Sequence, residues 1–217
     1  MTPPAAPVPT SLPASPPPLA AMCGQLLCVG FEGTVAPPEL LERIARSEVG
    51  TVILFRPNIA GPEPLADLVR TLRAAAPAEA PLVVAVDQEG GLVQRVRAPA
   101  TEWPPMMSVA AASDLGATEA VGRALGDELA LFGIGWTFAP VLDVHTNPAN
   151  PVIGTRAFGT TPSAVTDHAL AFWSGLRAAG VLGCGKHFPG HGDTHLDSHH
   201  DLPTVTHAVG RLQSVEL

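Results

Sequence analysis

Chemically reactive side chains gather in one stretch of the chain, residues 185–203. This stretch contains the only lysine of the protein, five of its eight histidines and three aspartates. A short apolar run, residues 181–184, precedes it and predicts a buried strand. A strand that leads into a polar loop rich in glycine and proline is typical of a site at the mouth of an α/β fold.

The histidines of this stretch raise the question of a metal site. Four of them, from His187 to His199, recur at every fourth residue, and on a helix such a ladder would present zinc ligands on one face. Pro189 and the two glycines that flank His191 lie inside the ladder, however, and together they oppose a helix by about 5 kcal/mol. We therefore expect a loop without a metal ion, and a metal-dependent hydrolase is the weaker alternative.

A second candidate is a carboxylate at the end of another expected strand. Asp87 follows four apolar residues, 83–86, which places its side chain where a strand would reach a cavity. A carboxylate in that place accepts two hydrogen bonds at once, which suits adjacent sugar hydroxyls. A salt bridge with Arg95 or Arg97 is the alternative role for Asp87. For Glu89, two residues further on, we expect the role of a structural partner, not a ligand contact.

Residues 186–199 read KHFPGHGDTHLDSH, and this motif resembles the signature of glycoside hydrolase family 3, in particular its single-domain beta-N-acetylglucosaminidase branch. Three further blocks resemble the family in the family's own order: residues 85–95, 138–144 and 153–158. The resemblance covers residues 24–207. It implies a retaining exo-beta-N-acetylglucosaminidase that needs no cofactor and hydrolyses terminal beta-linked N-acetylglucosamine in muropeptides or chitin-derived sugars. The alternative is a sugar-binding or interaction module without turnover.

The resemblance also implies which side chains would hold the sugar. Donors and acceptors from several strand ends can fix a neutral polyol by hydrogen bonding. The expected substrate contacts are Asp87, Arg95, Arg156, Lys186 and His187. By resemblance, Asp87 holds the outer hydroxyls of the bound N-acetylglucosamine. An ion pair with Asp143 is the alternative role for Arg156.

A further part of the resemblance concerns catalysis. In this branch of the family a histidine replaces the usual acid/base carboxylic acid, and the matching residues are His199 and Asp197, which would orient its ring. An imidazole can protonate a leaving oxygen and later deprotonate water, and a neighbouring aspartate stabilises the imidazolium. A surface loop with incidental histidines is the alternative. For His191 we expect a role in bracing the loop.

The family's nucleophile is an aspartate in a later motif of the Ser-Asp-Asp type. No stretch after residue 207 resembles that motif. Residues 211–217 are typical of the start of a helix, and Glu216 stands in a different context from the nucleophile. We therefore expect this chain by itself to be inactive.

Strands and helices are expected to alternate along the chain. The expected strands span residues 25–29, 51–55, 82–86, 135–138 and 181–184, and the expected helices span residues 38–44, 65–72, 118–132 and 162–179. Each polar motif follows the carboxyl end of a strand, which is the plan of a parallel (β/α)8 barrel of the TIM type. Because such a barrel takes about 250 residues, five to six units are expected here. An open sheet edge would favour self-association.

Composition narrows the function classes. Residues 1–20 contain eight prolines and no charge, which predicts a flexible tail before one barrel domain at residues 21–217. The net charge of −8 argues against a nucleic-acid partner, whose phosphates need a basic face. No apolar run approaches the length of a membrane span. Three cysteines, an odd number without CxxC spacing, favour reduced thiols in a cytoplasmic protein. The resemblance implies a small carbohydrate as its partner.

Overall fold

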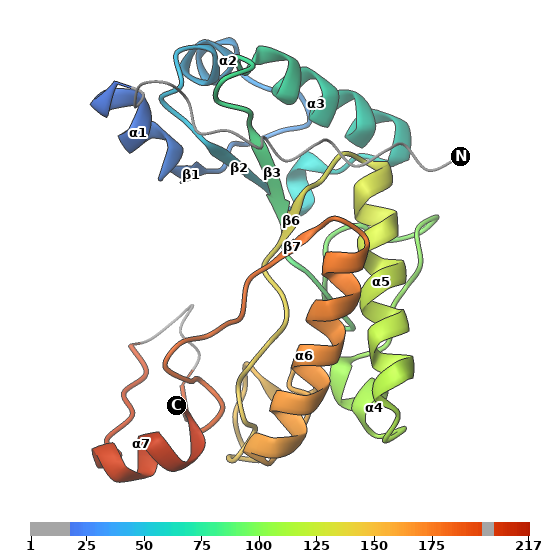
Figure 1. Cartoon of the computed structure of the whole chain (residues 1–217), viewed down its shortest axis with the longest axis vertical. Coiled ribbons are helices and arrows are strands. Elements are labelled where there is room, and N and C mark those ends of the chain that lie inside the picture. The colour runs from blue at the N-terminus through green and yellow to red at the C-terminus, as the bar shows by residue number, and fades with distance from the viewer. Residues whose placement is uncertain (1–17, 197–201) are drawn as a thin grey trace. The chain divides into compact units, whose positions relative to one another are not determined.

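The computed structural model describes residues 18–196 and 202–217. The chain forms two compact units, residues 1–84 and residues 85–217, and Figure 1 labels their elements. The division falls inside the central strand β3 (Val83–Val86). All expected substrate-binding residues belong to the second unit.

The first unit is built from parallel strands and short helices. Its described elements are α1 (Leu19–Gln25), β1 (Cys28–Val29), α2 (Pro38–Ala45), β2 (Thr51–Leu54), the 3-10 turn η1 (Arg56–Asn58), α3 (Pro62–Ala75) and the first half of β3. β1 and β2 pair in parallel, and the N–H of Val83 donates to the carbonyl of Gly50 at 3.0 Å. The predicted helix at residues 38–44 is confirmed, with proline in its first turn.

The sequence prediction for residues 25–29 is wrong in its first part. Gln25 ends helix α1, and only Cys28 and Val29 form the strand. Helix α1 lies in a run of good helix formers, and the N–H groups of Leu26 and Leu27 close its last turn on preceding carbonyls. The helix also takes in Leu19 and Ala20, which the sequence assigned to the tail, and Pro18 precedes its first turn; residues 1–17 of that tail lie outside the described residues.

The second unit contains the longer helices and the candidate site. Its described elements are the second half of β3, β4 (Gln88–Gly90), β5 (Val93–Gln94), α4 (Met106–Ala110), α5 (Leu115–Leu131), β6 (Trp136–Thr137), the 3-10 turn η2 (Gly154–Arg156), α6 (Pro162–Ala178), β7 (Leu182–Gly183) and α7 (Val209–Val215). Ala85 lies opposite Trp136, which lies opposite Leu182, and both pairings are parallel. The fold is therefore α/β, as the sequence predicts.

The parallel sheet is open. Among the described strands β7 pairs with β6 alone, so the sheet does not close into a barrel. The described chain has five parallel strands, β1, β2, β3, β6 and β7, which agrees with the predicted five to six units. A single parallel bridge, between Val141 and Lys186, continues the alignment past the ends of β6 and β7.

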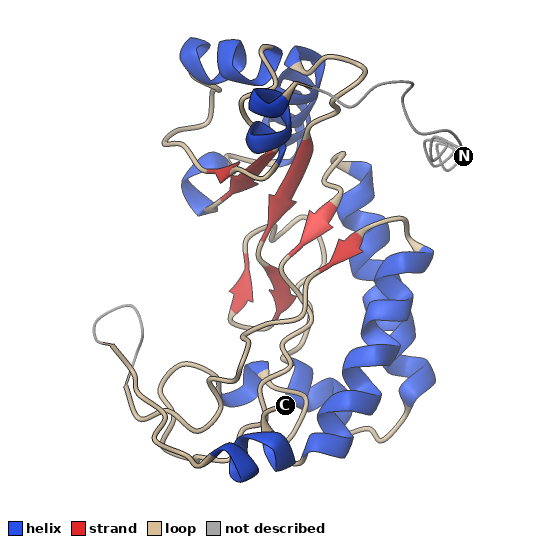
Figure 2. Cartoon of the chain, turned by 60° about the vertical axis from the view of Figure 1, so that its left-hand side comes forward, coloured by secondary structure: helices blue, strands red, loops and turns tan. Residues whose placement is uncertain are grey.

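Helices α5 and α6 lie side by side in both views of the chain (Figures 1 and 2). Their backbones approach closely at two glycines. A Cβ at Gly122 would overlap the carbonyl oxygen of Phe172, and one at Gly175 would overlap the carbonyl oxygen of Glu119. The predicted cap of α6 is confirmed, because Thr161 accepts a hydrogen bond from the first turn. In the described residues no helix is long and apolar enough to cross a membrane.

The sequence prediction missed a short antiparallel ribbon formed by β4 and β5. Gly90 and Gly91 both have positive φ, which allows the tight reversal between the two strands. The side chain of Gln88 joins the ribbon to the following turn, because its Oε1 accepts from the backbone N–H groups of Arg95 and Val96 at 2.8 and 3.0 Å. The ribbon therefore returns Arg95 to the carboxyl end of β3.

Candidate active site

Two carboxylates beyond the end of β3 share the only lysine of the chain. Asp87 directly follows β3, and Glu89 lies in β4. Lys186 lies in the loop after β7, and its Nζ is 2.8 Å from Asp87 Oδ1 and 2.5 Å from Glu89 Oε1. Asp87 and Lys186 are 17% and 16% exposed, so this contact is largely shielded from water but still reachable.

Glu89 also binds Arg156 through a two-pronged ion pair. Arg156 Nε and Nη2 donate to the two oxygens of Glu89 at 2.8 and 2.9 Å. Burial by itself disfavours the charged guanidinium, but the hydrogen bonds to Glu89 and its negative charge outweigh burial and raise the pKa of Arg156. Glu89 is the structural partner that the sequence predicts. The alternative prediction, an ion pair between Arg156 and Asp143, is wrong, because Arg156 pairs with Glu89 and Asp143 contacts His187.

Arg95 completes this side of the cluster. Its Nη2 lies 3.7 Å from Asp87 Oδ2, and its Nε is buried and has no hydrogen-bond partner in the described structure. Of the two alternative partners named for Asp87, Arg95 therefore forms a loose ion pair, while the closer partner, Lys186, was not among them. The other alternative partner, Arg97, pairs with Glu102 at 3.8 Å.

His187 joins the cluster from the residue after Lys186. Its Nε2 lies 3.5 Å from Nη2 of Arg156, and its Nδ1 lies 2.6 Å from Oδ2 of Asp143. The peptide bond between Lys186 and His187 is cis. Contacts thus link the five predicted substrate-binding residues, together with Glu89, into one network.

Asp143 is a functional candidate that sequence reasoning treated only as an alternative partner. Its side chain is fully buried, and its second oxygen accepts the backbone N–H of His191 at 2.6 Å. The signal for it was available, because Asp143 follows an apolar stretch in the same way as Asp87. Its partner could not be read from the sequence, since His187 lies 44 residues away.

The loop after β7 is held by polar contacts to the loop after β6. The buried amide of Asn150 donates to the carbonyls of His191 and Thr194 at 2.8 and 3.0 Å. The ring of His191 contacts the hydroxyl of Thr194. A Cβ at Gly192 would overlap the carbonyl of Val144, so glycine permits this close approach. His191 therefore braces the loop, as predicted.

Asp193, in the loop after β7, forms an aspartate–histidine pair that is more exposed than the pair of Asp143 and His187. Asp193 Oδ1 accepts the hydroxyl of Thr146 at 2.7 Å, and Asp193 Oδ2 lies 2.5 Å from Nε2 of His207. The Thr146 hydroxyl, and after it the ring of His207, hold the pKa of Asp193 below its usual value. The two residues of this pair lie on either side of the segment that carries the predicted catalytic residues.

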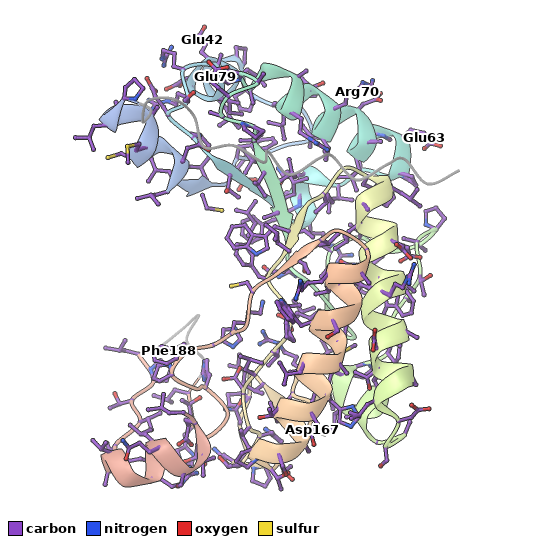
Figure 3. All side chains as sticks on the ribbon, in the orientation of Figure 1. Glu42, Glu63, Arg70, Glu79, Asp167 and Phe188 are labelled. Carbon is purple, nitrogen blue, oxygen red and sulfur yellow. The ribbon has the colours of Figure 1, made fainter. Side chains whose placement is uncertain are left out.

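The predicted acid/base pair itself, Asp197 and His199, lies outside the described residues. No role of either residue is therefore tested by the geometry. Within the described ranges, 18–196 and 202–217, no group of three or more metal-ligating side chains could hold an ion. Phe188 extends from the same loop with 88% of its surface exposed (Figure 3).

A separate cavity of about 550 Å³ lies beside helices α6 and α7. Leu142, Val165 and Trp173 contribute to its mostly apolar lining, and none of the charged residues of the polar cluster lines it. The charged residues of the polar cluster therefore lie outside this cavity.

The charges of the polar cluster balance. By formal charge, the cluster contains three carboxylates, those of Asp87, Glu89 and Asp143, and three cations. The cations are Arg95, Arg156 and Lys186. A site with both strong donors and strong acceptors and no excess charge suits a neutral ligand with many hydroxyls better than an anion.

These features define an α/β protein with a cluster of paired, hydrogen-bonding charged side chains at the carboxyl ends of parallel strands. The chain belongs to glycosyl hydrolase family 3, since the family model described as "Glycosyl hydrolase family 3 N terminal domain" matches residues 19–217.

Curated and solved relatives agree with this assignment. The chain is 44% identical over 192 residues to "Beta-hexosaminidase A" of Pseudoalteromonas piscicida, which covers 85% of this chain. It resembles the structure of a family 3 beta-N-acetylglucosaminidase from Paenibacillus sp. with a TM-score of 0.87 and 42% identity over 93% of this chain. It also resembles NagZ from Neisseria gonorrhoeae in complex with N-trifluoroacetyl-D-glucosamine, with a TM-score of 0.82 and 34% identity over 88% of this chain.

The chain spans only part of each relative. It covers 32% of the Pseudoalteromonas protein, 39% of the Paenibacillus chain and 57% of the Neisseria chain. The names beta-hexosaminidase A, beta-N-acetylglucosaminidase and NagZ belong to those longer proteins.

Proposed function

We propose that residues 21–217 form the amino-terminal barrel segment of a retaining exo-beta-N-acetylglucosaminidase. Its substrate class is terminal beta-linked N-acetylglucosamine in muropeptides or chitin-derived sugars, and its proposed place is cytoplasmic peptidoglycan recycling. One observation supports this proposal more than any other. Side chains from three strand ends meet in a charge-balanced network that contains every residue the sequence predicted to contact the sugar.

Within this proposal some residues of the cluster contact the sugar and others hold these residues in place. Asp87, with its acceptor oxygens, takes sugar hydroxyls as hydrogen-bond donors, while Lys186 and Arg95 donate to the same or neighbouring hydroxyls. Glu89 stays paired and fixes Arg156 and Lys186 in place, since it is 1% exposed. The sugar displaces little of this network, because the network is held together without it.

The chemical step is assigned to His199 and Asp197. His199 would protonate the leaving oxygen and then deprotonate the attacking water, and Asp197 would orient the ring. A retaining mechanism also needs a carboxylate nucleophile. No stretch after residue 207 resembles the motif of that nucleophile, and the carboxylate of Glu216 is paired with Arg211 at 2.8 Å.

Binding and turnover separate the parts of this proposal. We expect the 217-residue chain to bind N-acetylglucosamine in calorimetry and to release no product from an aryl N-acetylglucosaminide. Asp87→Asn should weaken binding by about tenfold or more, because an acceptor of sugar hydroxyls loses its charge. Asp167→Asn is the matched control, since Asp167 lies exposed on α6 (Figure 3).

Two results would contradict the proposal. Equal binding by the wild-type chain and Asp87→Asn would remove Asp87 from the sugar site. Multiple turnover by verified 217-residue material would mean that the nucleophile lies within this chain.

A sugar-binding module without turnover is the second candidate function, and the charge-balanced cluster is compatible with it as well. A longer product of the same reading frame that hydrolyses the aryl substrate would decide against it.

A further inference from the structure

Asp143 is the most deeply buried charged group around the site, and the proposed function gives it no role. Its side chain has no exposed surface, while the ring of His187 that it contacts is 35% exposed. A buried carboxylate is costly unless all its lone pairs find donors. Asp143 has two such donors close by, one on each oxygen.

The two hydrogen-bond partners of Asp143 differ in whether they can both donate and accept. The contact from His191 is a backbone N–H, which can only donate, so Oδ1 of Asp143 must accept. The contact from His187 is a ring nitrogen, Nδ1, which carries a proton in one tautomer and a lone pair in the other. Because an ionised carboxylate only accepts, it selects the tautomer in which Nδ1 carries the proton.

The other ring nitrogen of His187 supports the same tautomer. Nε2 faces Nη2 of Arg156 at 3.5 Å, and a guanidinium nitrogen only donates. Asp143 and Arg156, which contact the two ring nitrogens, therefore favour the same tautomer of His187. In this tautomer Nδ1 carries the proton toward Asp143, and Nε2 presents a lone pair toward the polar cluster.

We propose that Asp143 is a positioning residue that fixes His187 in the Nδ1–H tautomer, so that Nε2 presents a hydrogen-bond acceptor to a hydroxyl of the bound sugar. The second contact of Asp143, to the backbone of His191, ties the same carboxylate to the loop and holds the ring at a fixed angle. This inference rests on the proposed function only for the identity of the ligand. The tautomer is a property of the chain itself.

The substitution Asp143→Asn tests the inference sharply because its outcome is dictated by the backbone. The N–H of His191 requires the amide oxygen of the asparagine, so the amide NH₂ must turn toward Nδ1 of His187. Nδ1 must then accept, and the proton moves to Nε2. Nε2–H would face a donor of Arg156 and would offer a donor, not an acceptor, to the ligand.

The measurement is long-range ¹H–¹⁵N NMR of the histidine rings in the 217-residue chain, with Asp167→Asn as the matched control. We expect the Nδ1–H tautomer for His187 in the wild-type chain and in the control, and the Nε2–H tautomer in Asp143→Asn. The affinity for N-acetylglucosamine should fall about tenfold or more in Asp143→Asn. Replacing one ring hydroxyl of the sugar at a time by fluorine, which cannot donate, identifies the hydroxyl that faces Nε2.

A fluorinated sugar that loses affinity for the wild-type chain should lose less for Asp143→Asn, because Nε2–H can donate to fluorine. A doubly protonated or Nε2–H ring in the wild-type chain overturns the inference, and so does an unchanged tautomer in a folded Asp143→Asn. Where that variant does not fold, the wild-type tautomer decides alone. A third outcome is a wild-type chain whose His187 has the Nδ1–H tautomer but which does not bind the sugar. That outcome would reject the sugar as ligand and the proposed function, but not the positioning role of Asp143.

Discussion

Two aspartate–histidine pairs lie in the loop system after β6 and β7, and they differ chiefly in burial. Asp143 is fully buried and contacts Nδ1 of His187 at 2.6 Å. Asp193 is 24% exposed and contacts Nε2 of His207 at 2.5 Å. The chemical groups and the separations are nearly the same. The surroundings are not, because the first pair adjoins the polar cluster and the second lies at the base of the loop.

This difference decides what each pair can contribute. A buried charge that loses its partner leaves an uncompensated group in a medium of low polarity, which costs several kcal/mol. An exposed pair exchanges its partner for water at little cost. The buried pair can therefore impose a single ring orientation, while the exposed pair can only favour one path of the loop. A third pair, Asp197 and His199, is predicted to do the chemistry.

The largest effect is expected for His199 in a complete enzyme. His199→Ala should lower kcat/KM for a poor leaving group by about 10²–10⁴-fold and for an activated aryl leaving group by much less, because an activated group departs without a proton. Azide, which needs no base, should restore turnover and yield the azido sugar. Asp197→Ala should show a weaker form of the same pattern.

The described pairs supply the controls for that experiment. His207→Ala should lower activity for all leaving groups alike and only slightly, since His207 would act through the loop. If His207→Ala showed the leaving-group dependence and His199→Ala did not, the acid/base role would belong to the exposed pair.

The next effect concerns the stability of the buried pair. Asp143→Ala should lower the free energy of unfolding by about 3 kcal/mol, because it leaves the N–H of His191 and Nδ1 of His187 without their acceptor. Urea unfolding at one protein concentration measures this loss. Asp193→Ala, the matched change in the exposed pair, should cost less than about 1 kcal/mol. Equal costs for the two variants would show that burial does not separate the pairs.

Local signals in the sequence were enough to place the candidate residues on the fold. Thr161 as a cap, Pro162 in the first turn and Gly180 after the last turn fixed the bounds of α6 to within a residue. The apolar runs before Asp87 and Lys186 located two strand ends. Since parallel strands end at the same edge, convergence of their polar residues followed from the pattern alone.

The partners within the site could not be predicted in the same way. Arg156 binds Glu89, 67 residues away, although Asp143 is much closer to it in sequence. Such pairings depend on the path of the turns, and the short ribbon formed by β4 and β5 was not recognised. Helix α1 was missed because Leu19 and Ala20 were assigned to the tail and Gln25 to a strand, since a short apolar run fits a strand or a helix equally well.

The smallest effect concerns pH and the exposed pair. The pKa of Asp193 is lowered in the folded chain, so its ionised form stabilises the fold at pH values above the unfolded pKa of about 4. This contribution is lost as the pH falls through the lower, folded pKa.

Asp193→Asn removes the titration of this side chain and keeps its size. The difference in unfolding free energy between wild type and Asp193→Asn should stay below about 1 kcal/mol and shrink in acid. Thr146→Val should reduce that pH-dependent part, because the Thr146 hydroxyl contributes most to the lowered pKa. A difference that grows as the pH falls would reverse the sign and show that the fold favours protonated Asp193.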